Sequence, residues 1–271
     1  MTLLQIIVLA IVQGMTEFLP ISSSGHLVLA PSLLGWEDQG LAFDVAVHVG
    51  TLIAVVWYFR DDVLRMSLAF FKQWTPGQPD AQRQDARIAW YIIIGTIPVG
   101  IAGLVGKDFI EGSLRDPLVI AIATAFFGVL LWLTYALNKR KRALDGMNLR
   151  DTIIIGVAQI LALVPGTSRS GITMTAGFAL NFTPQAAARF SFLLSIPVIV
   201  LAGGLTTLDL LQVPGAVDWQ ALVVGTALSA IVAYLTIAFF LRFISRIGML
   251  PFMLYRLALA AVIIYLLLLS V

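Results

Sequence analysis

The chain has 271 residues, of which 59% are hydrophobic and only 12% are charged, and its mean hydropathy is +0.95. Soluble globular domains carry about 25% charged residues, so this composition excludes a soluble domain and indicates a protein whose apolar surface faces lipid. The net charge of +2 comes from basic residues at the ends of apolar runs, which excludes a nucleic-acid-binding face, and the absence of cysteine excludes disulfides and thiolate catalysis.

The first part of the chain alternates between short and long apolar runs. No basic segment precedes the first run, so we expect no removable signal peptide. The runs 3–12 and 27–34, which flank the polar stretch from Gln13 to His26, are too short for a span, which needs about 20 helical residues. Three runs of spanning length follow, at 41–59, 88–106 and 117–137.

The second part repeats this order. Short runs at 153–164 and 172–180 flank Pro165 to Gly171. Three more runs of spanning length follow, at 190–210, 219–241 and 250–270. Because polar backbone is tolerated at membrane depth only inside protein or along a wet cavity, each short pair indicates a re-entrant helical hairpin.

The pattern predicts an all-α polytopic membrane protein with six transmembrane helices and two re-entrant hairpins. We expect one integral membrane domain, residues 1–271, in which 1–137 and 151–271 form an inverted-topology repeat. The stretch from Gln13 through Pro20 to Gly25 parallels the stretch from Gln159 through Pro165 to Gly171, if one residue is inserted.

Basic residues predict the orientation. Cytoplasmic loops are enriched in Lys and Arg, and the face that carries the loops 60–87 and 138–150 has most of them, against Lys107 and Arg115 on the other face. These are Arg60, Arg65, Lys72, Arg83, Arg87, Lys139, Arg140, Lys141, Arg142, Arg150, Arg242 and Arg246. The first face is therefore predicted to be cytoplasmic, with both termini outside.

Glu17 is the acidic residue that this topology places inside a buried hairpin, which makes it a candidate functional residue. A structural alternative is a carboxylate that is hydrogen-bonded to a neighbouring helix. Gln13 lies one helical turn earlier on the same face. Carboxylate and amide oxygens are ligands for Mg²⁺ or Ca²⁺, although two such ligands alone are a weak signal.

Ser22, Ser23, Ser24, Gly25 and His26 follow the first arm. Hydroxyls at a helix N-terminus favour an anion, and a plain N-cap is the alternative. Three hydroxyls followed by an imidazole favour catalysis, with a serine as nucleophile.

Arg169 in the second hairpin is suited to bidentate binding of phosphate. A structural Arg169–Glu17 pair between the hairpins is an alternative, and the two roles can coexist. We expect Arg256 to snorkel towards the cytoplasmic end of its span. The other histidine, His48, is interpreted as a packing or gating residue.

Two motifs resemble the integral-membrane undecaprenyl-pyrophosphate phosphatases, also called bacitracin-resistance proteins. The first is Gln13-Gly14-Met15-Thr16-Glu17-Phe18-Leu19-Pro20 running into Ser22-Ser23-Ser24-Gly25-His26, and the second is Pro165-Gly166-Thr167-Ser168-Arg169-Ser170-Gly171-Ile172-Thr173. The similarity in length and span pattern extends over essentially the whole chain.

The resemblance implies hydrolysis of a C55 polyprenyl diphosphate to the monophosphate and inorganic phosphate, in the bacterial inner membrane, at a site reached from the outer face. Such a reaction recycles the lipid carrier for cell-wall synthesis and confers bacitracin resistance. By motif position, Gln13 and Glu17 would bind a divalent cation, Mg²⁺ or Ca²⁺. Ser23 would be the nucleophile, His26 the general acid/base and Arg169 a catalytic phosphate ligand. The other phosphate-binding residues would be Ser22, Ser24, Thr167, Ser168, Ser170 and Thr173.

Gln13 departs from the pattern of many members, which carry Glu there, and its lack of charge weakens the predicted metal site. A transporter or flippase for a phosphorylated polyprenyl lipid is the competing hypothesis, because inverted repeats with broken helices are a transporter plan. The residues leave open whether Ser23 attacks phosphorus or orients water, and whether the protein forms a homodimer.

Overall fold

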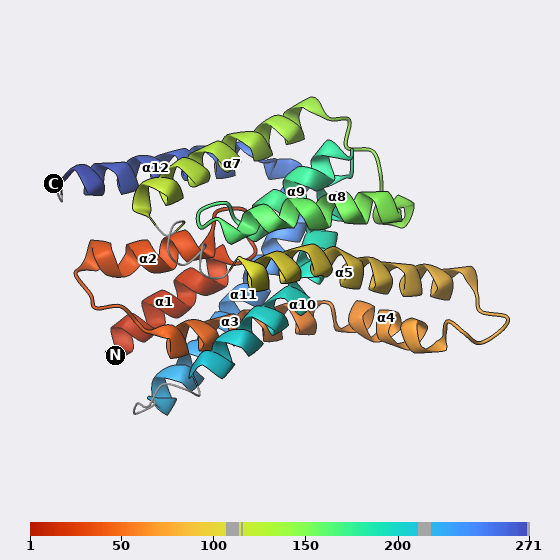
Figure 1. Ribbon diagram of the computed structural model, residues 1–271, viewed down its shortest axis with the longest axis horizontal. Helices are drawn as coiled ribbons and strands as arrows, with labels where there is room; N and C mark the ends of the chain where they lie inside the picture. The colour runs from red at the N-terminus through yellow and green to blue at the C-terminus, as the bar shows by residue number, and fades with distance from the viewer. Residues whose placement is uncertain (107–113, 115, 211–217, 270–271) are drawn as a thin grey trace.

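The computed structural model describes residues 1–106, 114, 116–210 and 218–269, and this part of the chain is helical (Figure 1). Within it, six helices are long and apolar enough to span a membrane, as predicted. They are α3 (Leu41–Tyr58), α5 (Asp80–Val105), α7 (Pro117–Leu137), α10 (Pro184–Leu210), α11 (Trp219–Ile247) and α12 (Leu250–Leu269).

Four shorter helices form two hairpins between these spans. They are α1 (Leu3–Thr16), α2 (Ser23–Leu34), α8 (Leu149–Ile160) and α9 (Arg169–Ala179), with the 3-10 turn η2 (Leu161–Leu163) after α8. The hairpins enter from opposite ends of the molecule, and their tips meet near its middle (Figure 1). Capping boxes at Thr2 and Asn148 fix the starts of α1 and α8. Re-entry from a membrane surface stays a prediction.

The two tips share one backbone conformation. Ser22 (φ 73°) precedes α2 and Ser168 (φ 69°) precedes α9, and a left-handed conformation is uncommon for residues other than glycine. Each of these serines also lies within hydrogen-bonding distance of the serine two residues later, Ser24 at 3.3 Å and Ser170 at 3.2 Å. The matching caps support the predicted repeat.

The register of this repeat differs from the prediction. Gln13 precedes Ser22 by nine residues, and Gln159 precedes Ser168 by the same nine. The two hairpins therefore align without an insertion when Ser22 is matched to Ser168. Pro20 and Pro165 are then out of register by one residue. The packing agrees, since α1 lies against α11 and α8 lies against α5.

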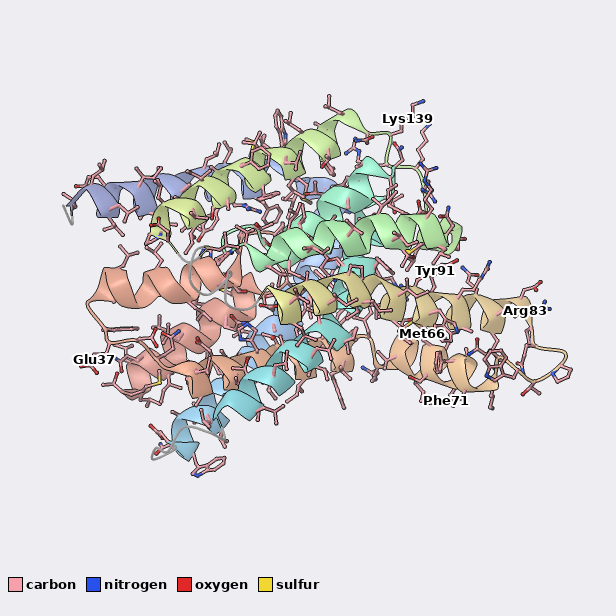
Figure 2. All side chains as sticks on the ribbon, viewed as in Figure 1. Glu37, Met66, Phe71, Arg83, Tyr91 and Lys139 are labelled. Atoms are coloured by element: carbon pink, nitrogen blue, oxygen red, sulfur yellow. The ribbon has the colours of Figure 1, made fainter. Side chains whose placement is uncertain are left out.

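The segment 60–87, which we expected to be a loop, is largely helical. It contains α4 (Arg60–Lys72) and the first turns of α5 from Asp80. Arg83 and Lys139 lie at one end of the molecule and Glu37 lies at the other (Figure 2), and both termini share the end of Glu37 (Figure 1). Which end faces the cytoplasm stays a prediction, and Lys107 and Arg115 lie outside the described residues.

The loop 138–150 is fastened to the base of the second hairpin. It contains the 3-10 turn η1 (Leu144–Gly146), and its Arg142 side chain donates two hydrogen bonds to the carboxylate of Asp151. These bonds raise the pKa of Arg142 above its usual value. Further bonds from Arg142 to the carbonyls of Gly146 and Leu180 tie α8, α9 and the loop together.

Candidate active site

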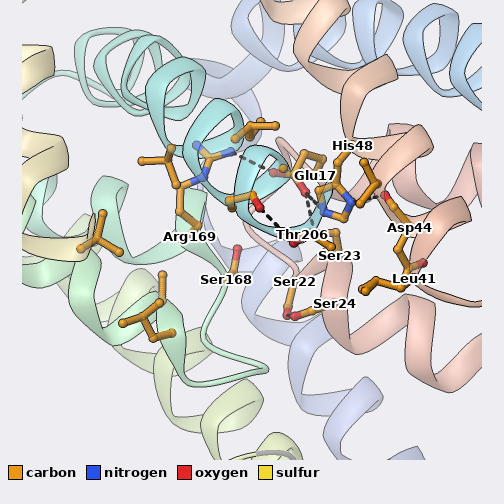
Figure 3. Close-up of a pocket in the computed structure, with 18 residues that line it drawn as sticks. Glu17, Ser22, Ser23, Ser24, Leu41, Asp44, His48, Ser168, Arg169 and Thr206 are labelled. Atoms are coloured by element: carbon orange, nitrogen blue, oxygen red, sulfur yellow. Dashed lines mark hydrogen bonds and ion pairs between the residues drawn. The ribbon is translucent and has the colours of Figure 1, made fainter. Parts of the chain in front are cut away.

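A cavity of about 370 Å³ lies where the two hairpin tips meet α3, α5 and α10 (Figure 3). Its polar lining comes from both tips, α3 and α10. The polar residues are Glu17, Ser22, Ser23, Ser24, Asp44, His48, Ser168, Arg169 and Thr206. Two segments of the chain that lie 152 residues apart in the sequence, at Glu17 and Arg169, thus contribute side chains to one site.

Glu17 is the centre of this cluster. The residue caps the C-terminus of α1, and only 8% of its side chain is exposed. Its Oε2 accepts a hydrogen bond of 2.7 Å from Ser23 Oγ and one of 3.1 Å from Gln13 Nε2. Its Oε1 accepts a bond of 3.1 Å from Arg169 Nη2. The carboxylate therefore joins the two hairpins, and the predicted Arg169–Glu17 pair is present.

Arg169 is held on two sides. It is the first residue of α9, directly after the left-handed Ser168. While Nη2 reaches Glu17, Nη1 donates a bond of 3.0 Å to the backbone carbonyl of Ser191 in α10. The guanidinium lies 6.0 Å from the centre of the buried Phe18 ring. These contacts direct its positive charge toward the cavity (Figure 3).

The remaining predicted phosphate ligands divide into two groups. Ser22, Ser24 and Ser168 line the cavity. Ser170 instead donates to the carbonyl of Leu19 and Thr173 bonds with Ser191, so both residues hold neighbouring elements together. Thr167 is also absent from the lining and is fully buried. The structure thus brings only part of the second motif to the site.

The structure places His48 rather than His26 in the cavity lining, whereas the sequence analysis expected His26 at the site. His26, the predicted acid/base, does not line the cavity. Its Nδ1 lies 2.7 Å from the carbonyl of Ser22 and its Nε2 lies 2.6 Å from the Tyr255 hydroxyl. His48 does line the cavity, with Nε2 3.7 Å from Glu17 Oε2.

The ring of His48 is oriented by its own helix. Its Nδ1 lies 2.7 Å from the carbonyl of Asp44, which requires the proton on Nδ1 and leaves Nε2 to face the cavity. Asp44 lines the cavity too, and sequence reasoning missed it. The available signal was the helical spacing of Asp44 and His48 on one face of a transmembrane segment, where ionisable residues are costly.

A model of the family described as "Bacitracin resistance protein BacA" matches residues 6–262. The chain belongs to the BacA family.

Relatives that match almost the whole chain are named as undecaprenyl-diphosphatases. An "Undecaprenyl-diphosphatase 2" of Stutzerimonas stutzeri is 58% identical over 270 residues, covering 98% of both chains. An "Undecaprenyl-diphosphatase" of Alteromonas mediterranea is 58% identical over 265 residues, also covering 98% of both. A protein of that name from Nitrosococcus oceani is 52% identical over 266 residues, covering 98% of this chain and 99% of the relative.

Arg256 supports the site of this BacA-family protein from behind. The prediction that it snorkels is wrong, because its side chain is 0% exposed. Its guanidinium donates to backbone carbonyls of Pro20 in the first hairpin, Gly166 and Thr167 in the second, and Thr124 in α7, over distances of 2.8–3.3 Å. Arg256 stays buried because these four carbonyls satisfy its guanidinium inside the protein.

A divalent cation would fit Gln13 and Glu17 only with the Gln13 side-chain amide reversed, because here Gln13 turns Nε2 and not Oε1 towards Glu17 Oε2, and Gln13 does not line the cavity. The described residues contain no group of three His, Asp or Glu side chains that is arranged around a common metal position. Gln13 Oε1 is buried and has no hydrogen-bond partner in the part of the chain that the structure describes. Mg²⁺ often takes one or two protein oxygens and completes its shell with water and substrate phosphates. Gln159 Oε1 is unpartnered as well, so this feature alone does not identify a metal.

Proposed function

We propose that the protein hydrolyses undecaprenyl diphosphate to undecaprenyl phosphate and inorganic phosphate. The names of relatives that share more than half of its residues support this activity. The observation that carries the proposal is the hydrogen bond from Ser23 to the buried Glu17 carboxylate, with Arg169 on the other carboxylate oxygen. A hydroxyl, a base and a phosphate-binding cation together suit phosphoryl transfer.

Ser23 and Glu17 are the proposed nucleophile and base. Ser23 Oγ attacks the terminal phosphorus, and its proton passes to Glu17 Oε2 at 2.7 Å. The bond from this phosphorus to the bridging oxygen breaks, and undecaprenyl phosphate leaves. Water then attacks the phosphorus of the phosphoserine, and the bond from phosphorus to Ser23 Oγ breaks. The phosphoryl group takes up the oxygen and both protons of the water and leaves as dihydrogen phosphate, which can release one proton to solvent, while Glu17 returns its proton to Ser23 Oγ.

Positive charge and helix termini hold the diphosphate. Arg169 supplies a planar cation for two phosphate oxygens. Both α2 and α9 begin at the cavity, and the free N–H groups of a helix N-terminus favour an anion. A divalent cation bound by Gln13 and Glu17 would neutralise further charge on the diphosphate.

The position of the cavity supports access from the outer face. It is lined by Leu41 and Asp44 at the N-terminal end of α3 and by Thr206 near the C-terminal end of α10. These helix ends share the side of the molecule on which both termini lie (Figure 1). If the basic end faces the cytoplasm, the cavity opens towards the outside.

Phosphate release by the purified protein in detergent tests the function. Undecaprenyl diphosphate should yield equimolar undecaprenyl phosphate and inorganic phosphate. Glu17→Gln, which keeps the shape of the side chain, should reduce the rate at least 10²-fold because it removes the base. EDTA should abolish release, and added Mg²⁺ or Ca²⁺ should restore it. A pure transporter or flippase releases no phosphate, so absence of release by folded wild-type protein with added cations would contradict the proposal.

A further inference from the structure

The walls of the cavity differ in polarity. The hairpin tips and α3 contribute the charged and hydroxyl side chains. The part of the lining that comes from η2, α5 and α10 is apolar except for Thr206. Its apolar residues are Val99, Ala162, Leu163, Val198, Ile199, Ala202 and Gly203. A polyprenyl diphosphate is divided in the same way, into a charged head and a hydrocarbon chain.

The chain of such a substrate must leave the cavity sideways. Drug-sized ligands occupy pockets of about 300–1,000 Å³, so a cavity of about 370 Å³ has room for a diphosphate and only the first part of a C55 chain. The rest of the chain is hydrocarbon and belongs in the bilayer. An opening in the apolar wall is therefore required.

The accessible surface locates that opening on α10. Val99 and Ile199 are each only 7% exposed, so they form the closed part of the wall. Beyond Pro197 the outer residues of α10 lie on the surface of the described molecule, and Val200 and Leu201 are 53% and 50% exposed. Ala202 is exposed and still lines the cavity, so here the wall meets the outer surface of the bundle.

Gly203 lies at this edge and leaves it open. It lines the cavity, and among the residues that the structure describes a Cβ built on it would meet no heavy atom within 4 Å apart from its own helix. We infer that Gly203 and Ala202 form a lateral portal at the edge of α10, through which the prenyl chain passes from the cavity into the bilayer. This inference rests on the proposed function and adds a hydrocarbon-binding site to it.

Gly204 provides a matched control. Its Cβ position likewise meets no heavy atom within 4 Å in the part of the chain that the structure describes, but it does not line the cavity. Successive residues of an α-helix are rotated by about 100°, so side chains at 203 and 204 project in different directions. A Cβ at either position meets no described atom within 4 Å outside the helix, and replacing glycine within a helix does not lower helix propensity.

The test compares Gly203→Phe with Gly204→Phe on prenyl diphosphates of increasing length, from C15 to C55, in detergent. Burial of two methylene groups is already worth about tenfold in affinity. We therefore expect Gly203→Phe to lower kcat/KM for the C55 substrate at least tenfold more than for the C15 substrate, while Gly204→Phe leaves that ratio unchanged.

Other results would overturn the portal. Equal losses for all chain lengths would mean that the substitution disturbs the diphosphate site, and unchanged ratios would mean that the chain leaves elsewhere. If Gly203→Phe does not fold, Ala202→Phe on the same edge gives the same comparison. Failure of the wild-type protein to release phosphate from any substrate would instead refute the proposed function.

Discussion

Arg169→Lys tests whether the guanidinium acts on phosphate or only joins the hairpins. The arginine fork connects Glu17 Oε1 at 3.1 Å to the Ser191 carbonyl at 3.0 Å. One ammonium cannot occupy both nitrogen positions, so lysine loses one charged hydrogen bond, worth about 1.5–3 kcal/mol of stability. Loss of a preorganised donor to a developing charge should further reduce the rate by about 10²–10³-fold.

The assay measures phosphate release at saturating undecaprenyl diphosphate together with thermal unfolding in detergent. For Arg169→Lys we expect kcat per folded molecule to fall by about 10²–10³-fold. Arg142→Lys is the control, because Arg142 also binds a carboxylate, that of Asp151, but lies away from the cavity. That control should lose stability and keep its turnover. Normal turnover per folded molecule in Arg169→Lys would remove Arg169 from the catalytic site.

Three further outcomes follow from the geometry. Ser23→Ala should reduce phosphate release more than Ser22→Ala, because Ser23 donates to the catalytic carboxylate; equal small losses would contradict a serine nucleophile. His48→Gln should lower kcat more than His26→Gln, because His48 and not His26 faces Glu17, and the reverse order would restore His26 as the acid/base. A cysteine at position 141 should resist impermeant thiol reagents in intact cells, and labelling there would reverse the proposed orientation.

The spans were predictable because they depend on local hydrophobicity. The run 41–59 matches α3 (Leu41–Tyr58), and the run 117–137 matches α7 residue for residue. The polar segment from Asp80 to Arg87 was not predicted to be helical. Hydropathy detects the membrane-spanning part of a helix and does not detect polar turns that extend the same helix.

The site was predictable where its residues are close in sequence. Gln13, Glu17 and Ser23 lie within one hairpin, so their proximity follows from local structure. The direction of the histidine side chains depends on distant partners. Tyr255 in α12 engages His26, and packing of α3 beside α1 brings His48 to Glu17. The spacing of Asp44 and His48 could mark His48 as a candidate, but the partner of each histidine lies on a distant segment and cannot be read from the local sequence.

The buried charge of Arg256 bears on how far the two halves of the protein can move. Alternating-access transporters rock one repeat against the other around a fixed site. Here a single guanidinium holds Pro20 of one hairpin tip and Gly166 of the other at the same time. Separating the tips would break charged hydrogen bonds worth about 1.5–3 kcal/mol each and leave carbonyls unpaired. A catalytic site gains from such rigidity, whereas a rocking carrier would have to overcome it in every cycle.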